Sequence, residues 1–414
     1  MKKNAVKGSL GAIALASAMT MSMGTPVFAL QRDNVYSTEI DGTKTTTFDK
    51  YLVMDQQAEV PNASFTYAVT AGTAKAYDVA GKKFAVLAGV DADKVTMAGV
   101  GTKTANTITY KQGDATLNDK NELVKDYYKE TDKYAKKTAT LDFSACRFTE
   151  PGIYRYIVTE SGTNQAVTND ADATRVVDVY VNDASGEDEN KLTIAGYVLH
   201  SNADDAPDVS LGENNGSAGS YVATKSQGFT NSYDTSDIFI AKHVSGNQAS
   251  RDKYFEFTVN ITDAIPGTVY DVDLSDADAT TKTNAATITA NEGKTNPATL
   301  TVGADGTVTQ KFYLAHNQSI VIQGVAKDSK YKVTENAEDY KSTPADAIHN
   351  AEGRGDATSG TVASKDIYTG YVNTRDGVIP TGVIMTVAPF AAVTLLGGAG
   401  AVTMVIKKKK SEEE

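Results

Sequence analysis

Hydrophobic and polar residues alternate with a period of two along most of the chain. Runs rich in Val, Ile, Tyr, Phe and Thr are separated by clusters of Gly, Asn, Asp and Ser at the spacing of strands and turns. Side chains two residues apart in a strand share a face, so such runs predict sheets with a buried face. The 414 residues are enough for two or three domains. We therefore expect an all-β protein of two tandem immunoglobulin-like antiparallel β-sandwiches.

One stretch interrupts this alternation. Between Asn118 and Lys137, leucine, valine and tyrosine side chains are set among lysines and acidic residues. The spacing favours a helix over a strand. We expect a surface helix here, on an insertion in the first sandwich.

A polar segment, residues 232–237, divides the chain into two blocks with similar landmarks in the same order. Each block opens with a strand-like run that contains a lysine, passes a Val-Thr-Glu sequence, and closes with an asparagine. The lysines, glutamates and asparagines are Lys50, Glu160 and Asn231 in the first block, and Lys242, Glu335 and Asn373 in the second. We expect one domain over residues 30–235 and another over residues 236–377.

Both lysines fall on the face that the apolar side chains occupy. Lys50 shares its face with Phe48 and Leu52, and Lys242 shares its face with Ile240. By the same count, both glutamates and both asparagines lie on apolar-leaning faces. A lysine that reaches past apolar surface to solvent is the ordinary interpretation of one such position. Two sets with matching order and parity favour burial instead.

Buried charged groups shift their pKa values toward the neutral form, down for lysine and up for glutamate. A neutral amine is a nucleophile, and a protonated carboxyl group can donate a proton to a nearby carboxamide. If the three side chains of one block meet, the amine can attack the asparagine carbonyl and release ammonia. The product is an amide cross-link, formed at the high effective molarity that the fold provides.

The N-terminal segment, residues 1–29, has the form of a secretory signal peptide. Lysines precede an uncharged stretch that ends in Val27-Phe28-Ala29, a small-residue cleavage pattern. We expect the mature chain to begin near Leu30. An N-terminal membrane anchor is the alternative interpretation.

The C-terminal segment has the form of a membrane span with a cytoplasmic tail. Residues 383–406 carry no charge and are long enough to cross a bilayer. Four lysines follow at once in the tail, residues 407–414, and such a cluster keeps its end of the chain in the cytoplasm. The bulk of the chain is therefore expected outside the cell.

A short motif at residues 378–382 directly precedes this span. Its core reads Ile379-Pro380-Thr381-Gly382. The motif, the span and the lysines together resemble a Gram-positive sortase signal, which implies cleavage between Thr381 and Gly382 and transfer of the threonine carbonyl to an amine. Ile replaces the usual Leu and one residue of the general pattern is absent, which leaves the class of sortase open.

Composition excludes several other classes of protein. The formal net charge of −12 at pH 7 gives no basic surface for nucleic acid. A single cysteine excludes an intramolecular disulfide framework and multi-cysteine zinc patterns, and the four histidines are dispersed. No nucleophile–base pair or phosphate-binding loop is recognisable. We therefore expect no metal, no cofactor, no nucleic-acid partner and no enzymatic activity beyond a reaction of the chain with itself.

The run from Lys50 to Tyr67 resembles the opening of the FctA-type major pilins of streptococci. Asn373-Thr374-Arg375, before the sorting signal, is similar to their ending. The resemblance implies an autocatalytic Lys–Asn isopeptide bond between the first and last strands of each domain. The implied bonds are Lys50–Asn231 assisted by Glu160, and Lys242–Asn373 assisted by Glu335.

Such pilins polymerise when sortase joins the terminal threonine of one subunit to a lysine of the next. In the family this lysine lies shortly before the asparagine that ends the first domain, and Lys225 is the best match by position. Strict alternation would place Lys225 on the face of Asn231, so its access to solvent requires a break of register at Gly228.

These inferences predict the major, shaft subunit of a sortase-assembled covalent pilus, anchored to the cell wall of a Gram-positive bacterium and supporting adhesion and colonisation. The implied partners are sortase, further copies of the chain, minor pilins, peptidoglycan and a ligand on a host surface. The alternative is a wall-anchored adhesin displayed singly, or a binding protein at a pilus tip.

Overall fold

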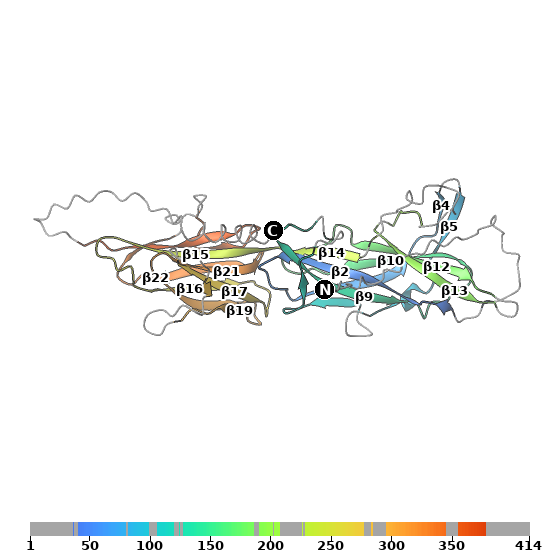
Figure 1. The fold of residues 1–414 in the computed structure, drawn as a ribbon, viewed down its shortest axis with the longest axis horizontal. Coiled ribbons are helices and arrows are strands. Elements are labelled where there is room, and N and C mark those ends of the chain that lie inside the picture. Colours follow the sequence, from blue (N-terminus) through green and yellow to red (C-terminus); the bar gives the residue numbers. More distant parts are fainter. Residues whose placement is uncertain are drawn as a thin grey trace, which may run out of the picture.

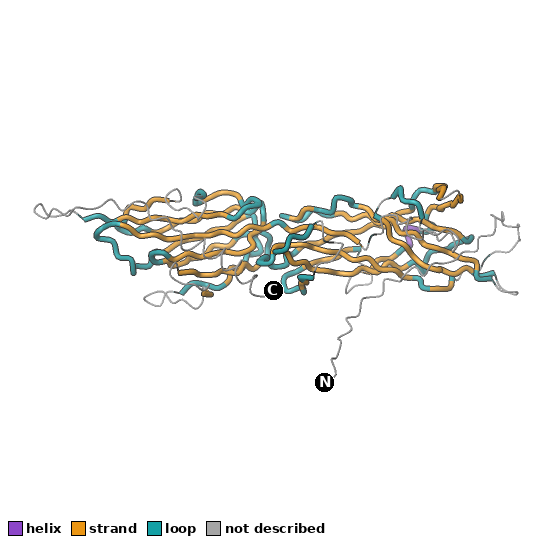
Figure 2. Tube along the Cα trace, turned by 45° about the horizontal axis from the view of Figure 1, so that its top comes forward, coloured by secondary structure: helices purple, strands orange, loops and turns teal. Residues whose placement is uncertain are grey.

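The computed structural model describes residues 36, 40–79, 82–98, 106–119, 124, 127–185, 190–201, 203–207, 226, 228–276, 283–284, 295–344 and 355–377. They form two β-sandwiches placed end to end in an elongated molecule (Figure 1). Most strands run along the long axis of the molecule (Figure 2). The prediction of an all-β chain with two tandem sandwiches is confirmed.

The N-terminal sandwich pairs an eight-stranded with a six-stranded sheet. The first sheet has the order β1-β13-β12-β10-β3-β7, with β5 beside β10 and β4 beside β5; the second has the order β11-β14-β2-β9-β6, with β8 beside β9. The strands are β1 Asp41–Gly42, β2 Thr45–Asp55, β3 Ala63–Ala71, β4 Lys75–Val79, β5 Lys82–Ala88, β6 Thr96–Ala98, β7 Thr107–Tyr110, β8 Thr116–Leu117, β9 Asp132–Asp142, β10 Gly152–Ser161, β11 Val167–Thr168, β12 Thr174–Asp183, β13 Leu192–His200 and β14 Gly228–Tyr233.

The C-terminal sandwich pairs a seven-stranded with a four-stranded sheet. The first has the order β18-β17-β21-β15-β25-β23, with β19 beside β17, and the second has the order β20-β16-β22-β24. The strands are β15 Thr235–Ser245, β16 Phe255–Thr262, β17 Val269–Asp276, β18 Thr283–Asn284, β19 Thr299–Thr301, β20 Val308–Leu314, β21 Gln318–Ala326, β22 Lys330–Asn336, β23 Lys341–Pro344, β24 Ser359–Thr361 and β25 Ile367–Thr374.

Each sandwich encloses its own core, to which both of its sheets contribute. In β3 and β16 buried and more exposed residues alternate strictly along much of the strand, as the sequence pattern predicts. Aromatic side chains dominate the middle of the first core, where Phe48, Tyr67 and Phe229 pack ring against ring with centroids 5.1–5.6 Å apart. The central strand β21 is buried along its whole length.

The prediction of a helix between Asn118 and Lys137 is wrong for the residues of this stretch that the structure describes. Strand β9 starts at Asp132, and the described residues 118–119, 124 and 127–131 form turns and loops. Among the described residues the one helical element is a 3-10 helix, η1, at Ala92–Lys94. The apolar residues of this stretch cover the outer face of the six-stranded sheet, where Tyr134 packs against Tyr51 with ring centroids 5.7 Å apart. A covered sheet face, not a helical stripe, accounts for their spacing.

The two sandwiches meet through side chains as well as through the chain. The chain passes between them at Asp234, whose carbonyl oxygen accepts a hydrogen bond from the N–H of Lys327 at 3.0 Å. Asn62 donates a hydrogen bond from Nδ2 to the carbonyl oxygen of Pro266 at 2.9 Å. Ile265 of the second sandwich packs into the first core. The junction is therefore packed on several sides.

The predicted signal peptide, residues 1–29, and the C-terminal signal, residues 378–414, lie outside the described residues. Within the part of the chain that is described, no helix has the length and apolar character needed to cross a membrane.

Candidate functional site

In each sandwich the predicted lysine and asparagine lie on neighbouring parallel strands. In the pairing of β2 with β14, Phe229 lies opposite Lys50. In the pairing of β15 with β25, Tyr371 lies opposite Lys242. Each asparagine follows its aromatic residue by two positions, and residues two apart share a face. Lysine and asparagine therefore point into the same core with the same diagonal offset in both sandwiches.

Glu160, on β10 of the facing sheet, lies between Lys50 and Asn231. Its Oε1 lies 2.9 Å from Lys50 Nζ and accepts a hydrogen bond from Asn231 Nδ2, also at 2.9 Å. Its Oε2 lies 2.7 Å from Lys50 Nζ and accepts a hydrogen bond from the hydroxyl of Tyr67 at 2.5 Å. The exposed fractions are 0% for Lys50 and Asn231 and 7% for Glu160. One buried carboxyl group thus contacts both the amine and the amide nitrogen.

Burial favours the neutral form of the Lys50 amine. It lowers the pKa of the Lys50 amine from 10.5 to about 8, although the Glu160 carboxylate opposes this change. An amine of pKa 8 is neutral in about a tenth of molecules at pH 7, whereas one of pKa 10.5 is neutral in about three in ten thousand. Nζ also lies 4.2 Å from the centre of the Phe65 ring. The site therefore raises the population of the nucleophilic form.

The carboxamide of Asn231 is held at both ends. Nδ2 donates a second hydrogen bond to Oδ1 of Asn169 at 3.1 Å, and Oδ1 of Asn231 accepts the backbone N–H of Asp170 at 3.0 Å. The nitrogen thus faces the carboxyl group of Glu160, and the carbonyl oxygen faces a hydrogen-bond donor. A donor at this oxygen stabilises the negative charge that develops there when a nucleophile attacks the carbonyl carbon.

The second site repeats this plan with fewer polar contacts. Lys242 Nζ lies 2.5 Å from Oε1 of Glu335 and 4.3 Å from the centre of the Phe255 ring. Glu335 Oε2 accepts a hydrogen bond from the hydroxyl of Ser342 at 3.0 Å. Burial lowers the pKa of Lys242 to about 8, with Glu335 acting in the opposite direction. The buried carboxamide of Asn373 has no hydrogen-bond partner among the described residues.

Strand register identifies equivalent positions in the two sites. Tyr67 lies opposite Glu160 on the neighbouring strand, and Phe257 lies opposite Glu335 in the same way. The second glutamate therefore has a phenyl ring where the first has a phenolic donor. Burial and the nearby Glu160 charge raise the pKa of Tyr67, so its hydroxyl keeps its proton and donates.

These contacts suit an amide exchange between side chains. A neutral lysine amine can attack the asparagine Cγ, and its proton can pass to the glutamate that touches it. The same carboxyl group can then protonate the amide nitrogen, which leaves as ammonia. A new Nζ–Cγ bond replaces the Cγ–Nδ2 bond, so atoms and charge balance without a cofactor. Among the described residues no group of three or more His, Cys, Asp or Glu could hold a metal ion.

Three predicted residues lie outside the described part of the chain: Lys225, Thr381 and Gly382. Strand β14 pairs with β2 from Gly228 onward without a shift of register. Residues 225 and 227 lie outside the described residues, so the break of register at Gly228 that would bring Lys225 to solvent stays a prediction.

Sequence reasoning missed the role of two glycines. Gly228 and Gly370 have φ angles of +155° and +153°, which favour glycine. A Cβ at Gly228 would lie 1.6 Å from the carbonyl oxygen of Asp49, and one at Gly370 would lie 2.0 Å from that of Ala241. The available signal was the repeated pattern of glycine, aromatic residue, any residue and asparagine at 228–231 and 370–373.

Comparison with known families assigns a class to the chain. Residues 94–234 match FctA, the Spy0128-like isopeptide containing domain. Residues 236–375 match a domain of unknown function, DUF7601. Residues 94–234 are therefore similar to the FctA-type isopeptide containing domain, in agreement with the resemblance of the landmarks to FctA-type pilins.

Pilins of Streptococcus pyogenes are among the proteins to which the chain is similar. The chain is 26% identical over 383 residues to a pilin of Streptococcus pyogenes serotype M1, covering 90% of this chain and 92% of the relative. Two solved structures are also similar, each at 20% identity and each covering 81% of this chain and 100% of the other: a major pilin of Streptococcus pyogenes, with a TM-score of 0.49, and the T3.2 major pilin of serotype GAS13637, with a TM-score of 0.45.

Proposed function

We propose that this protein is the shaft subunit of a covalent surface pilus, stabilised by two internal isopeptide bonds. The observation that carries the proposal is the fully buried lysine and asparagine that meet one carboxyl group in the N-terminal sandwich. Homology to a streptococcal pilin over 90% of the chain supports the same function.

The proposed domains are residues 30–235 and 236–377, each closed by one bond. Glu160 assists the bond of Lys50 to Asn231, and Glu335 assists the bond of Lys242 to Asn373. Each bond joins the first long strand of a sandwich to its last strand, which lies beside it. A pulling force on the chain ends would then pass through the bond and leave the strands between them unloaded. The bonds would serve this cysteine-poor chain as disulfides serve other secreted proteins.

Assembly depends on the two ends of the precursor. We propose that residues 1–29 direct export, that a sortase cleaves between Thr381 and Gly382, and that the Thr381 carbonyl is joined to Lys225 of the next subunit. Residues 383–406 would hold the precursor in the membrane until cleavage. Further partners would be minor pilins and, at the base of the polymer, peptidoglycan.

Polymerisation tests this function. Cell-wall extracts boiled in SDS should contain a ladder of high-mass species that react with an antibody to the chain. Replacement of Lys225 by alanine should collapse the ladder, whereas the same change at Lys332, an exposed lysine on β22, should leave it intact. A single band for the unaltered protein would overturn the shaft function and favour an adhesin displayed singly.

A further inference from the structure

The N-terminal sandwich contains a buried ion pair beside the first site. Arg175, on β12, contacts Asp170, with Nη2 and Oδ2 2.7 Å apart. The two residues are 7% and 9% exposed. A buried ion pair is weak support for stability, because desolvation of two charges offsets their attraction. Stability of the fold alone therefore does not account for this ion pair.

The pair holds one edge of β14, the strand that carries Asn231. Asp170 accepts the backbone N–H of Thr230 at 2.7 Å, and Arg175 donates from Nε to the carbonyl oxygen of Gly228, also at 2.7 Å. The guanidinium lies 4.6 Å from the ring centre of Phe229, between these two points. The side chains of Asp170 and Arg175 thus form hydrogen bonds with backbone groups of β14 that would otherwise pair with a neighbouring strand.

In the second sandwich, the strand that carries the asparagine is held by ordinary pairing with a neighbouring strand. Strand β23 pairs with β25 along its edge, and Ser342 lies opposite Asn373. In the first sandwich β11 pairs with β14 only at Tyr233 and Ser232, and stops short of the asparagine. The ion pair begins where that short ladder ends.

We propose that Asp170 and Arg175 are positioning residues for the first cross-link, replacing a strand ladder and fixing the carboxamide of Asn231 for attack. The inference rests on the proposed Lys50–Asn231 bond. Asp170 controls the asparagine twice, through the N–H of the preceding residue and through its own N–H on Oδ1. As Lys50 Nζ bonds to Cγ and Nδ2 leaves as ammonia, the charge on Oδ1 is stabilised by the Asp170 N–H.

The pair also acts on the amine by its charge. The groups that influence Lys50 are the carboxylates of Glu160 and Asp170, which raise its pKa, and the guanidinium of Arg175, which lowers it. The phenols of Tyr67 and Tyr110 also face this site. The Tyr67 hydroxyl donates a hydrogen bond to Glu160, and the Tyr110 hydroxyl donates one to the backbone carbonyl oxygen of Lys50. Loss of Arg175 leaves Asp170 without its counter-charge, so the Lys50 amine keeps its proton to a higher pH.

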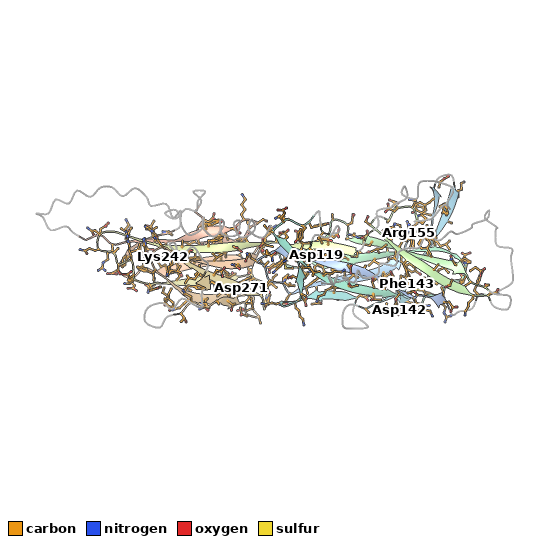
Figure 3. All side chains as sticks on the ribbon, in the orientation of Figure 1. Asp119, Asp142, Phe143, Arg155, Lys242 and Asp271 are labelled. Atoms are coloured by element: carbon orange, nitrogen blue, oxygen red, sulfur yellow. The ribbon has the colours of Figure 1, made fainter. Side chains whose placement is uncertain are left out.

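The test compares two buried arginines of the same sandwich. Arg155, on β10, forms two 2.7 Å contacts with Asp178, and its other side-chain hydrogen bonds go to Tyr77 and the carbonyl oxygen of Ala203, neither of which lies on β14; Figure 3 labels it. The mature chain and its Arg175→Met and Arg155→Met variants are sampled at intervals after synthesis, at several pH values. Intact mass counts the ammonias lost, and peptide mapping identifies which bond has formed.

Arg175→Met should slow the first bond roughly tenfold to a hundredfold, as expected for a misplaced reactive group. The pH at which the first bond forms fastest should also be higher in this variant. The second bond should form at the original rate. Arg175→Lys, which keeps the charge, should be slowed less and should retain the original pH profile. Arg155→Met should form both bonds at the original rates.

An Arg175→Met variant that forms the first bond at the original rate, or an Arg155→Met variant that is slowed equally, would overturn the positioning role. If Arg175→Met does not fold, an Arg175→Lys variant that forms the first bond at the original rate would overturn that role as well. An unaltered chain that keeps both ammonias would overturn the cross-links themselves, and this inference with them.

Discussion

Lys50 of the first long strand and Asn231 of the last meet at a single oxygen atom, Oε1 of Glu160, which lies 2.9 Å from Nζ of the lysine and 2.9 Å from Nδ2 of the asparagine. A group in this position can take a proton from the nucleophile and give one to the leaving group. The fold provides the proximity, and burial provides the neutral amine.

The glycines before each asparagine should be required for cross-linking. Gly228→Ala places a Cβ against the carbonyl oxygen of Asp49 and strains a positive φ, at a cost of about 1–3 kcal/mol for the backbone alone. We expect β14 to move away from β2 and the first bond to be lost, with the second retained. Gly370→Ala should abolish the second bond and retain the first. Peptide mapping by mass spectrometry distinguishes the two bonds.

Gly196, on β13, provides the matched control. A Cβ at this position meets no atom within 4 Å, so Gly196→Ala should retain both bonds. Formation of the first bond at the normal rate in Gly228→Ala would show that the close approach of β14 to β2 is not needed.

Tyr67→Phe should slow the first bond without preventing it. The change removes one hydrogen bond to Glu160 and creates the arrangement that Phe257 has at the second site. A hydrogen bond to a charged group contributes about 1.5–3 kcal/mol, so we expect a measurable delay in the loss of the first ammonia. A Tyr67→Phe chain that never forms the bond would mean that the phenol takes part in the chemistry.

Without the bonds, stability should increase with pH in a defined window. In a chain with Asn231→Ala and Asn373→Ala, both lysines remain free, each with its pKa lowered by burial to about 8. Unfolded lysines keep their protons to a pKa of 10.5, so unfolding takes up protons above pH 8 and the free energy of unfolding increases. We expect denaturation midpoints to rise from pH 8 to about pH 9.5, below the ordinary pKa of tyrosine.

The same background with Lys50→Met and Lys242→Met removes both titrations and serves as the control. Its midpoints should show no such rise over that window; the buried Cys146 thiol, whose pKa burial raises to about 11, lowers the stability of both chains equally above about pH 9, so the difference between them reports the two lysines. Equal slopes in the two chains would contradict the lowered pKa values of the lysines.

Loss of one bond should greatly destabilise its own sandwich. A cross-link from residue 50 to residue 231 closes a long loop in the unfolded chain, and loop-closure entropy predicts a loss of about 5 kcal/mol when it is removed. Asn231→Ala should therefore lower the melting temperature of the N-terminal sandwich and leave that of the C-terminal sandwich unchanged, as measured by calorimetry. Equal melting of the altered and unaltered chains would mean that the bond does not stabilise the fold.

Strand periodicity predicted much of the fold and part of the site. It correctly placed Lys50, Lys242, Asn231 and Asn373 on buried faces, because a two-residue repeat fixes the side of a sheet on which a residue lies. It failed around Tyr134, where apolar residues that cover the outside of a sheet have a spacing similar to a helical stripe.

The remaining contacts depend on loops and on pairing between distant strands. Asn169 and Asp170 reach Asn231 from the loop that follows β11, and no local pattern marks that loop. Arg175 lies in a strand with ordinary alternation, and its role emerges only from the short ladder between β11 and β14. Pairing of strands far apart in sequence is set by the whole fold, so sequence patterns alone could not identify these residues.

The most direct test of the two isopeptide bonds is the intact mass of a recombinant chain from Leu30 to Asp376. We expect a mass lower than the sequence mass by two ammonias, and lower by only one in Lys50→Ala or Glu335→Ala. A chain with the full mass of its sequence would show that neither bond forms.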